Sequence, residues 1–486
     1  YVNDAPHIGH AYTSIACDVL ARFNRLNNRN TMFLTGTDEH GLKVEQAAKK
    51  KNMETKKFVD EMSVSFKKLT KKLNLSNDFF IRTTDIYHKK ASQHIWNILK
   101  KNNQIYLDKY KGWYSINDEA YFNDNEISTD KKTKKKIAPS GHEVQWVEEE
   151  SYFFKLSKWQ SKLLDYYQKN PDFIGPESRK NEVISFVKNG LKDLSISRTT
   201  FSWGIQVPNN AKHVMYVWLD ALINYLSAIG YPDKKYKKFW PANVHIIGKD
   251  IIRFHAVYWP AFLLAADIEP PKRIFAHGWW TNEGKKISKS LGNVIDPNEI
   301  IKAYGVDTLR FFLLREVPFG NDGDFSKKSL QRRMNNDLAN DLGNLVQRVL
   351  TIINKNLDGK LSKIKQIKEN DKKIYVYPEE LLKNIEKNYE KQEFHKVIEN
   401  IWKLISKANK YVDESAPWQL IKDDRERAGD VLNILVIIIA KIAIFLAPIM
   451  PDISENILNK IGLSIKNLTM EDISKNNFLK IMKKLI

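Results

Sequence analysis

Two histidines flank a glycine near the start of the chain, in Pro6-His7-Ile8-Gly9-His10. Apolar residues follow at helical spacing from Ile8 to Leu26, so His7, Gly9 and His10 stand where the chain enters a helix. A helix start offers unpaired N–H groups and a positive dipole end, and both suit a phosphate. Gly9 lets a ligand approach the backbone, and the imidazoles can donate hydrogen bonds to phosphate oxygens. Taken alone, such a pair is more often a surface pair or a helix cap.

A second cluster lies far downstream, where Lys286-Ile287-Ser288-Lys289-Ser290 follows a predicted strand (Arg273 to Gly278) and a turn at Gly284. Two ammonium groups on a small loop can close over a triphosphate and neutralise the charge that grows as pyrophosphate leaves. Together the two clusters resemble the paired motifs of class I aminoacyl-tRNA synthetases. The residues between them narrow the resemblance to methionyl-tRNA synthetases, and it runs along nearly the whole chain.

The resemblance implies ATP-dependent joining of L-methionine to its tRNA through a methionyl-adenylate, with release of AMP and pyrophosphate. The catalytic residues that it implies are His7, His10, Lys286 and Lys289. The residues implied for ATP, which carries Mg²⁺, are His7, Gly9, His10, Asp250, Lys286, Ser288 and Lys289. Those implied for methionine are Tyr1, Asp38, Trp218, Ala221, Leu222, Tyr225, His255 and Trp259.

Asp38 and Asp250 each follow a short apolar run predicted to be a buried strand, over Thr31–Thr35 and Val244–Ile247. Polar residues at the carboxyl ends of such strands mark the binding crevice of an open parallel sheet. By resemblance, Asp38 binds the α-amino group of methionine and Asp250 binds the ribose hydroxyls. Without the resemblance, Asp38 is equally compatible with a helix cap.

Four residues of one predicted helix stand at i, i+3, i+4 and i+7, namely Trp218, Ala221, Leu222 and Tyr225. The spacing alone favours core packing. By resemblance the four line the methionine side-chain pocket, which His255 and Trp259 complete. A polarizable thioether is well satisfied against aromatic rings, at roughly 0.3–1.5 kcal/mol per contact.

The stretch from Gly112 to Tyr121 resembles an insertion that carries zinc-binding cysteines in many relatives, two of them at the positions of Ser115 and Asp118. The only cysteine is Cys17, which excludes a Cys₄ zinc site and a disulfide framework. We therefore expect no structural zinc, and an insert held by the packing of Trp113, Tyr114, Tyr121, Phe122 and Trp146. Arg198, where the insertion ends, acts near the active site by resemblance or else lies in an exposed salt bridge.

From about Ser326 onward the pattern is nearly all helical. Asn344 and Arg348 are four residues apart on one helix face, and Trp418 lies in another helix or its leading loop. By resemblance these residues read the methionine anticodon, Trp by stacking and Asn and Arg by hydrogen bonds to base edges. Without it, a buried Trp and an ordinary helix-face Arg would be preferred.

The chain has 486 residues, which suggests about three domains. We expect an α/β fold, in which a Rossmann-type parallel-sheet catalytic domain is split by a connective insertion and followed by an all-α helical bundle that binds the anticodon. The expected boundaries are 1–108 and 208–283 for the catalytic halves, 109–207 for the insertion, 284–325 for the lysine loop and linking region, and 326–486 for the bundle.

The formal net charge of +20 fits a polyanionic partner such as RNA, although abundant lysine can supply it without any binding face. The most apolar run, Val431 to Ala447, is interrupted by Asn433 and Lys441, which favours a buried bundle helix over a membrane span. We expect a cytoplasmic monomer that binds the acceptor end and anticodon of methionine tRNA and no membrane, with an organelle matrix as the open alternative. We expect no signal peptide at the start of the chain, and we expect its start at Tyr1 to reflect a truncation.

Three rivals stay open. The first is a sister synthetase for leucine, isoleucine, valine or cysteine. However, the region from Asn103 to Asp193 is short for the editing insertion of the branched-chain enzymes, and a cysteine enzyme would need zinc ligands. The second is a small-molecule nucleotidyltransferase, which would not need the helical C-terminal region. The third is a non-catalytic RNA-binding relative, which should have lost His10 or Lys289, and both are present.

Overall fold

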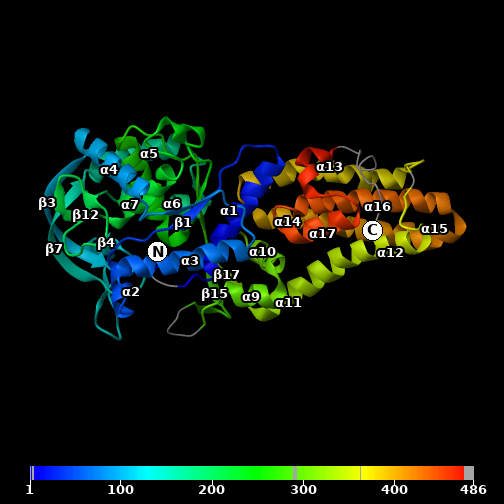
Figure 1. Cartoon of the computed structure of the whole chain (residues 1–486), viewed down its shortest axis with the longest axis horizontal. Coiled ribbons are helices and arrows are strands. Elements are labelled where there is room, and N and C mark those ends of the chain that lie inside the picture. Colours follow the sequence, from blue (N-terminus) through cyan, green and yellow to red (C-terminus); the bar gives the residue numbers. More distant parts are fainter. Residues whose placement is uncertain (1, 3–4, 288–292, 362, 475–486) are drawn as a thin grey trace. The chain divides into compact units, whose positions relative to one another are not determined.

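The computed structural model describes residues 2, 5–287, 293–361 and 363–474 (Figure 1). The chain divides into two units, each assembled from segments that lie far apart in the sequence. Unit 1 contains Tyr1–Pro6, Leu34–Lys71 and Asn77–His277, and unit 2 contains His7–Phe33, Lys72–Ser76 and Gly278–Ile486. The predicted domain boundaries stay predictions.

Unit 1 is built on short parallel strands. β1 (Leu34–Thr37) pairs with β2 (Phe79–Arg82), and β14 (Ile274–His277) lies between β13 (His245–Gly248) and β8 (Ile174–Gly175). Parallel strands are usually covered on both faces, and the central strand β14, Ile-Phe-Ala-His, is buried along its whole length. The predicted α/β class is confirmed. β1 begins later than the predicted Thr31–Thr35, because β2 starts opposite Leu34.

Helices of unit 1 connect and accompany these strands. They are α2 (Leu42–Lys50), α3 (Thr55–Lys72), α4 (Ile86–Lys101), α5 (Gln160–Lys169), α6 (Glu177–Lys188), α7 (Val217–Ser227) and α8 (Trp259–Ala265), with a π-helical turn at Phe254–Tyr258. The sequence pattern predicts helices over Leu42–Leu73, and the structure divides this stretch into α2 and α3. Asn52 has a φ of 52° and lies just past the end of α2, in the left-handed conformation that commonly stops a helix.

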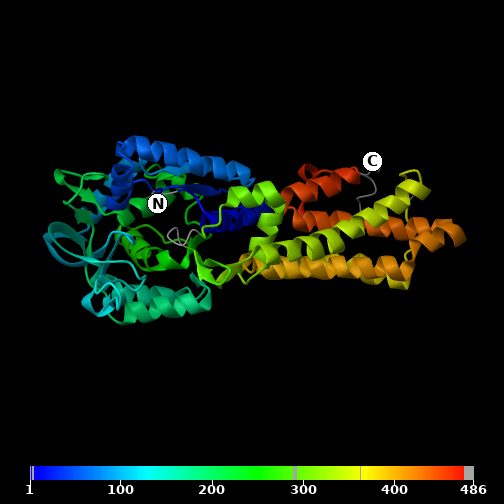
Figure 2. The same ribbon diagram turned by 90° about the horizontal axis from the view of Figure 1, so that it is seen from below.

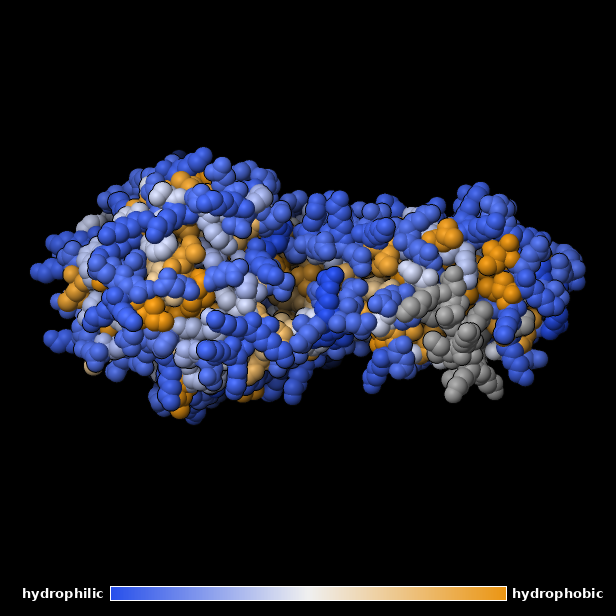
Figure 3. Space-filling view, turned by 90° about the horizontal axis from the view of Figure 1, so that it is seen from above, coloured by the Kyte–Doolittle hydropathy of each residue, from blue (hydrophilic) through white to orange (hydrophobic). Residues whose placement is uncertain are grey.

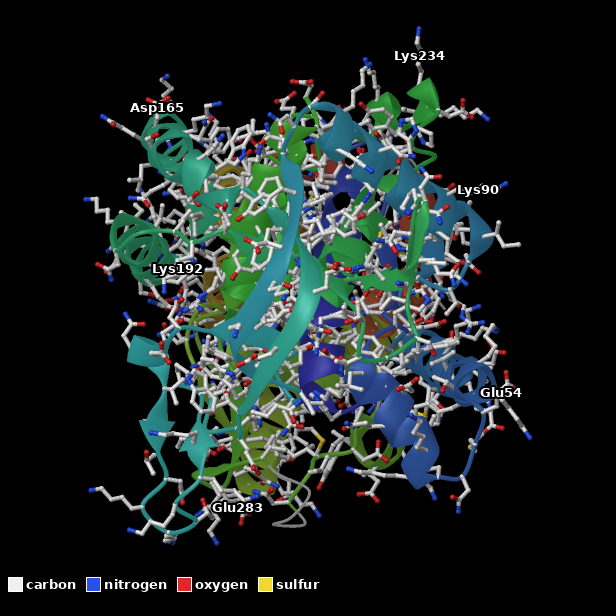
Figure 4. The ribbon with its side chains drawn as sticks, turned by 90° about the vertical axis from the view of Figure 1, so that its left-hand side faces the viewer. Glu54, Lys90, Asp165, Lys192, Lys234 and Glu283 are labelled. Carbon is white, nitrogen blue, oxygen red and sulfur yellow. The ribbon has the colours of Figure 1, made fainter. Side chains whose placement is uncertain are left out.

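The connective insertion is dominated by a long antiparallel ribbon. β3 (Ile105–Ser115) pairs with β7 (Gln145–Phe154), and Figure 4 looks onto this ribbon. The shorter strands are β4 (Ala120–Phe122), β5 (Ser128–Thr129), β6 (Lys136–Ile137), β9 (Leu194–Ser195), β10 (Ser197–Arg198), β11 (Gln206–Val207) and β12 (Asn210–Met215). The expected aromatic packing is present, with 5.2 Å between the ring centroids of Trp113 and Trp146 and 5.0 Å between those of Tyr114 and Tyr121. Phe122 packs, partly buried, against the core that contains Tyr114, whereas the side chain of Trp146 is 49% exposed.

Hydrogen bonds join the two turn positions at which the resemblance implies cysteines in many relatives. The N–H of Asp118 donates to the hydroxyl of Ser115 at 3.2 Å. The Asp118 carboxylate accepts from Ser140 at 2.7 Å and pairs with Nδ1 of His142 at 2.6 Å. Among the described residues, no group of three or more His, Cys, Asp and Glu side chains is placed to hold a metal ion.

Unit 2 starts with α1 (Ile8–Leu26) and continues, after residue 277, into a small sheet and a helical bundle. The strands are β15 (Trp280–Asn282), β16 (Lys285–Lys286) and β17 (Gly323–Phe325), and the helices beside them are α9 (Pro297–Tyr304) and α10 (Val306–Arg315). The bundle contains α11 (Lys327–Arg333), a π-helical stretch at Met334–Gly343, α12 (Asn344–Asn356), α13 (Glu369–Glu390), α14 (Phe394–Ser415), α15 (Pro417–Asp423), α16 (Arg425–Leu446) and α17 (Pro451–Lys460). Figure 2 shows its long helices running side by side, and the predicted helical C-terminal region is confirmed.

The helix α16 forms the centre of the bundle. Its side chains from Ala428 to Leu446 are all buried. Its length and hydropathy alone would allow a membrane crossing, but 94% of its most apolar window is buried inside the protein. This is the behaviour of a core helix, as its interruption by Asn433 and Lys441 predicts. Figure 3 shows one face of the molecule, where hydrophilic residues cover most of the surface.

A buried ion pair ties α1 to the rest of unit 2. Asp18 and Arg310 are fully buried, and Nη2 of Arg310 donates to Oδ2 of Asp18 at 2.6 Å. Arg22 and Ser76 also donate hydrogen bonds to Asp18. Arg310 also donates to the carbonyl oxygens of Leu73, Pro448 and Ile449. Because the network is satisfied on both sides, loss of the guanidinium would leave several buried oxygens without a donor.

We expect Arg310→Met to lower the free energy of unfolding by about 3–5 kcal/mol, the usual cost of breaking a buried ion pair from one side. Urea denaturation followed by circular dichroism measures this loss. Arg332→Met is the control, since the side chain of Arg332 is 59% exposed and lies 3.5 Å from Glu316. Its loss should cost less than about 1 kcal/mol. Equal losses in the two variants would contradict a structural role for the buried pair.

Candidate functional site

The histidine motif caps its own helix in unit 2. Nδ1 of His7 accepts the N–H of Gly9 at 3.1 Å, and Nδ1 of His10 accepts the N–H of His7 at 3.1 Å. The N–H of Ile8 donates to the carbonyl of Ile295. The prediction of unpaired N–H groups at this helix start is therefore wrong for these residues, because the imidazoles and a neighbouring loop already use them.

These capping bonds fix the tautomers of both rings. A neutral imidazole whose Nδ1 accepts a hydrogen bond carries its hydrogen on Nε2. Burial, and next the nearby His7, lower the pKa of His10, so this ring is neutral near pH 7. The ring centroids of His7 and His10 are 4.0 Å apart, so both Nε2–H groups belong to one small patch. A Cβ at Gly9 would stand 2.9 Å from the His7 ring, so the cap itself requires glycine there.

The lysine loop is described only in part. The backbone of Lys286 lies in β16 and pairs with Thr281 of β15. Ser288 and Lys289 lie outside the described residues, as do Tyr1 and the side chain of Lys286. The roles predicted for these residues in binding ATP and methionine stay predictions.

In unit 1, Asp38 and Asp250 follow the carboxyl ends of β1 and β13, as predicted. Gly248, which ends β13, lies so close to Asp250 that a Cβ would stand 2.6 Å from Oδ1 of Asp250. Asp38 is half-buried, and burial raises its pKa. The alternative of a helix cap is wrong for Asp38, since Gly41 occupies the N-cap of α2. Ligands of open α/β sheets bind at these strand ends.

The loop that carries Asp38 is held on several sides. Glu39 is buried, and its carboxylate accepts two hydrogen bonds from Arg82, at 2.7 and 2.9 Å. The indole N–H of Trp203 donates to the carbonyl of Glu39 at 2.7 Å, and the N–H of Gly41 donates back to the carbonyl of Trp203. The position of Asp38 is thus set by the fold before any ligand binds.

The residues predicted to hold the methionine side chain gather in one aromatic cluster, as far as the structure describes them. They are Trp218, Ala221, Leu222 and Tyr225 on α7, with His255 and Trp259 on the helical segment after β13. Trp218 stacks on Phe254 with 3.9 Å between centroids, and the hydroxyl of Tyr225 lies 2.8 Å from Nε2 of His255. Tyr225 also stacks on His245 at 4.0 Å, and the indole N–H of Trp259 donates to that imidazole.

His255 is neutral and its tautomer is fixed. Its Nδ1 donates to the carbonyl of Ile251 at 3.0 Å, so Nε2 accepts the hydroxyl hydrogen of Tyr225. Burial lowers the pKa of His255 to about 4. The cluster therefore presents uncharged, polarizable ring surfaces, which suit a thioether better than a charged or strongly polar side chain.

Sequence reasoning missed Phe254 and His245 as members of this cluster. Pro260 in the first turn of α8 lacks an N–H, and the carbonyl of Ala256, four residues earlier, accepts the hydroxyl of Tyr167 at 2.6 Å instead. The π-helical turn before α8 brings both Phe254 and His255 against Trp218. The only sequence signal for this irregular turn is the proline.

Arg198 is buried, so the alternative of an exposed salt bridge is wrong. Its Nε pairs with the carboxylate of Glu149, and its guanidinium lies 4.2 Å from the ring centroid of Tyr114. In the described structure it is a core residue of the insertion.

In the bundle, Arg348 and Trp418 lie together. The guanidinium of Arg348 is 5.6 Å from the ring centroid of Trp418 and donates to Asp413 at 2.7 Å. Trp418, in the first turn of α15, is 45% exposed, so the alternative of a buried tryptophan is wrong. Asn344 is exposed one turn before Arg348 on α12. An exposed indole beside a guanidinium is the arrangement on which unpaired bases stack.

Comparison with known proteins identifies two matching families. Residues 1–350 match the family described as tRNA synthetases class I (M), and residues 363–484 match the anticodon binding domain of methionyl tRNA ligase. The methionine–tRNA ligase of Rickettsia felis is 55% identical over 471 residues, which cover 96% of this chain and 91% of that protein. That of Brucella suis is 49% identical over 475 residues, covering 97% of this chain and 92% of the relative.

Solved structures give the same result. The crystal structure of Mycobacterium tuberculosis methionyl-tRNA synthetase bound by methionyl-adenylate matches with a TM-score of 0.95 and 46% identity, covering 98% of this chain and 95% of that one. The apo form of that synthetase matches with a TM-score of 0.87 and 43% identity, covering 98% and 92%. By sequence along nearly its whole length and by fold, the chain belongs to the methionyl-tRNA synthetase family of class I aminoacyl-tRNA synthetases.

Proposed function

We propose that the chain joins L-methionine to its tRNA in two steps. The methionine carboxylate attacks the α-phosphorus of ATP, which gives methionyl-adenylate and releases pyrophosphate. The terminal ribose hydroxyl of the tRNA then takes the methionyl group and AMP leaves. The ligase activity follows from the family, and the structural neighbour that holds methionyl-adenylate supports the intermediate.

The observation that carries the substrate assignment is the aromatic cluster of unit 1. Trp218 and Tyr225 supply ring faces, and His255 beside them is neutral. Roughly 0.3–1.5 kcal/mol is available from each contact between a sulfur and a ring, so a thioether gains more here than a branched aliphatic side chain does. Asp38, at the end of β1, is our candidate for the α-ammonium group, and a carboxylate–ammonium bond is of the strong, charge-assisted kind.

The chemistry of activation needs no side-chain nucleophile. Catalysis of such a phosphoryl transfer is positioning plus stabilisation of the charge that grows on the leaving group. We assign to His7 and His10 the donation of Nε2–H hydrogen bonds to phosphate oxygens, in line with their tautomers. Lys286 and Lys289 supply positive charge, and Ser288, Gly9 and Asp250 complete the proposed ATP contacts. Mg²⁺ enters as the counter-ion of ATP.

The tRNA contacts are assigned to the bundle. Trp418 would stack on an anticodon base, and Arg348 and Asn344 would bond to base edges, as proteins read single-stranded loops. The exposed Trp418 beside Arg348 supports this assignment. We also propose that the chain works as a monomer without a membrane partner, in a reducing compartment such as the cytoplasm.

Pyrophosphate exchange tests the substrate assignment. We expect exchange of labelled pyrophosphate into ATP to require methionine. Leucine and isoleucine should support it roughly 100-fold less well or worse in kcat/KM, because their branched carbons fit the ring cluster poorly. Exchange driven equally well by isoleucine would remove the methionine assignment.

Substitution of two carboxylates should affect the KM for methionine and the KM for ATP separately. We expect Asp38→Asn to raise the KM for methionine about 10- to 100-fold with little change in the KM for ATP, since a hydrogen bond to a charged group is worth ~1.5–3 kcal/mol. Asp250→Asn should do the reverse. Exchange kinetics with each substrate varied in turn measure both constants, and a rise in the same KM for both variants would refute the assignment.

The bundle assignment predicts a defect confined to the tRNA step. Trp418→Ala should lower kcat/KM for tRNA charging by about tenfold or more, since stacking is worth ~1–3 kcal/mol per base, while exchange stays unchanged. Tyr377→Ala is the matched control, because Tyr377 carries Lys407 at 4.7 Å and forms a second aromatic–cation pair in the bundle. An equal charging defect in both variants, or a matching loss of exchange, would count against anticodon reading by Trp418.

A further inference from the structure

A buried carboxylate lies on α7, on the side turned away from the aromatic cluster. The side chain of Asp220 is 1% exposed, and each of its oxygens is paired with an imidazole. Oδ2 lies 2.6 Å from Nδ1 of His40, and Oδ1 lies 2.7 Å from Nε2 of His88. The two histidines come from different elements, since His40 belongs to the loop after β1 and His88 to α4.

The helical phase gives α7 two working faces. Trp218, Leu222 and Tyr225 repeat at i, i+4 and i+7 and so share one face. Asp220 follows Trp218 by two residues, about 200° further around the helix, and therefore points the other way. One face of α7 thus builds the aromatic cluster, and the opposite face is anchored to the loop after β1 and to α4.

The loop that Asp220 holds through His40 is the loop that carries Asp38. His40 follows Asp38 by two residues, and Glu39 between them is fixed by Arg82 and Trp203. His40 also lies against Trp203, with 5.6 Å between ring centroids. The 2.6 Å bond from His40 to Asp220 is therefore a direct link between the element of the ammonium candidate and the helix of the thioether pocket.

Asp220 is ionised in this setting. Burial opposes its ionisation, but His40 and His88 outweigh burial and lower the pKa of Asp220 to about 2. Its negative charge in turn helps burial to raise the pKa of Asp38, while His88 acts in the opposite direction.

The histidine on α4 is itself braced against α7. Nδ1 of His88 lies 2.8 Å from the hydroxyl of Ser227, the last residue of α7, and Ser92 donates to the carbonyl of His88 at 3.0 Å. The groups that bond to Asp220 are therefore His40 from the loop and His88 from α4, and His88 is also bonded to Ser227 of α7 itself. Both histidines have a further contact, His40 with Trp203 and His88 with Ser227, so each imidazole is held from two sides.

We propose that Asp220 is a positioning residue of the methionine site, which locks α7 against the loop after β1 through His40 and against α4 through His88. The lock keeps the ammonium subsite and the thioether subsite at the separation that one methionine requires. This inference rests on the proposed roles of Asp38 and the aromatic cluster. It adds that the selection of methionine depends on a carboxylate outside the pocket.

The direct test is Asp220→Asn, which keeps the shape, removes the charge and turns an amide N–H toward one imidazole. We expect the KM for methionine in pyrophosphate exchange to rise at least tenfold, with the KM for ATP within about threefold of the starting value. The dissociation constant for methionine alone, from quenching of tryptophan fluorescence, should rise in parallel, because Trp218 and Trp259 line the cluster.

The matched control is Asp371→Asn in the bundle. Its side chain is also 1% exposed, and it pairs with Arg427 at 2.6 Å and accepts from Tyr411 at 2.7 Å. Loss of this carboxylate should disturb stability to a comparable degree and leave the KM for methionine unchanged. A rise of the methionine KM in both variants would mean that general destabilisation, and not the position of Asp220, is responsible, and it would overturn the proposal.

A second pair of variants decides the matter if Asp220→Asn does not fold. His88→Gln keeps a donor toward Asp220, whereas His88→Leu removes it. We expect the glutamine variant to retain a near-normal KM for methionine. In the leucine variant the KM for methionine should rise at least fivefold. Equal values for the two would overturn the proposal.

The outcome also separates this inference from the proposed function. An effect of Asp38→Asn on the methionine KM without one of Asp220→Asn would sink only the positioning role.

Discussion

In unit 1, two imidazoles from different elements, His40 and His88, converge on one buried carboxylate, Asp220, and fix the position of α7. Taking a carboxylate out of water costs several kcal/mol, and the cost is recovered only when both oxygens are well bonded. Asp220 meets that condition with His40 and His88 at 2.6 and 2.7 Å. Because these partners sit on separate elements, satisfying the charge also fixes α7 in place. The aromatic cluster on the other face of α7 is held in place as a result.

Unit 2 also contains a helix that is fixed by a buried carboxylate, which is bonded by a different set of donors. Asp18 on α1 is fully buried and is bonded by Arg310, Arg22 and Ser76. The helix so anchored begins with the self-capping His7 and His10. In each unit, then, a helix that carries candidate site residues is fixed by a buried carboxylate away from those residues. Phosphoryl transfer requires precise positioning of the reacting groups, and a helix that is fixed in this way keeps its side chains in position.

The sequence predicted well the features that depend on the spacing of residues along a single element. Helical phase places Trp218, Leu222 and Tyr225 on one face, and strand-then-carboxylate patterns place Asp38 and Asp250 at the ends of parallel strands. The α/β class and the helical C-terminal bundle could be predicted for the same reason. So could the family, because its motifs are spread along nearly the whole chain.

Features that depend on contacts with another element, or on local backbone geometry, could not be predicted from the sequence pattern. Nothing at Asp220 itself says that two histidines, 180 and 132 residues away, will meet it. The histidine motif suggested open N–H groups, whereas the rings cap the helix themselves. The stop after α2 depends on the backbone of Asn52, and the stacking of Phe254 depends on a π-helical turn. Each is decided by tertiary contacts or local backbone geometry that periodicity does not encode.

We infer that Asp38 and the ring cluster of unit 1 together form the site for one methionine. A crystal structure of the chain with L-methionine tests it most directly. We expect the ammonium group to lie within hydrogen-bond reach of Asp38 and the sulfur to lie against the rings of Trp218, Tyr225 and His255. Methionine bound with its ammonium group away from Asp38, or with its side chain outside these rings, would contradict the account.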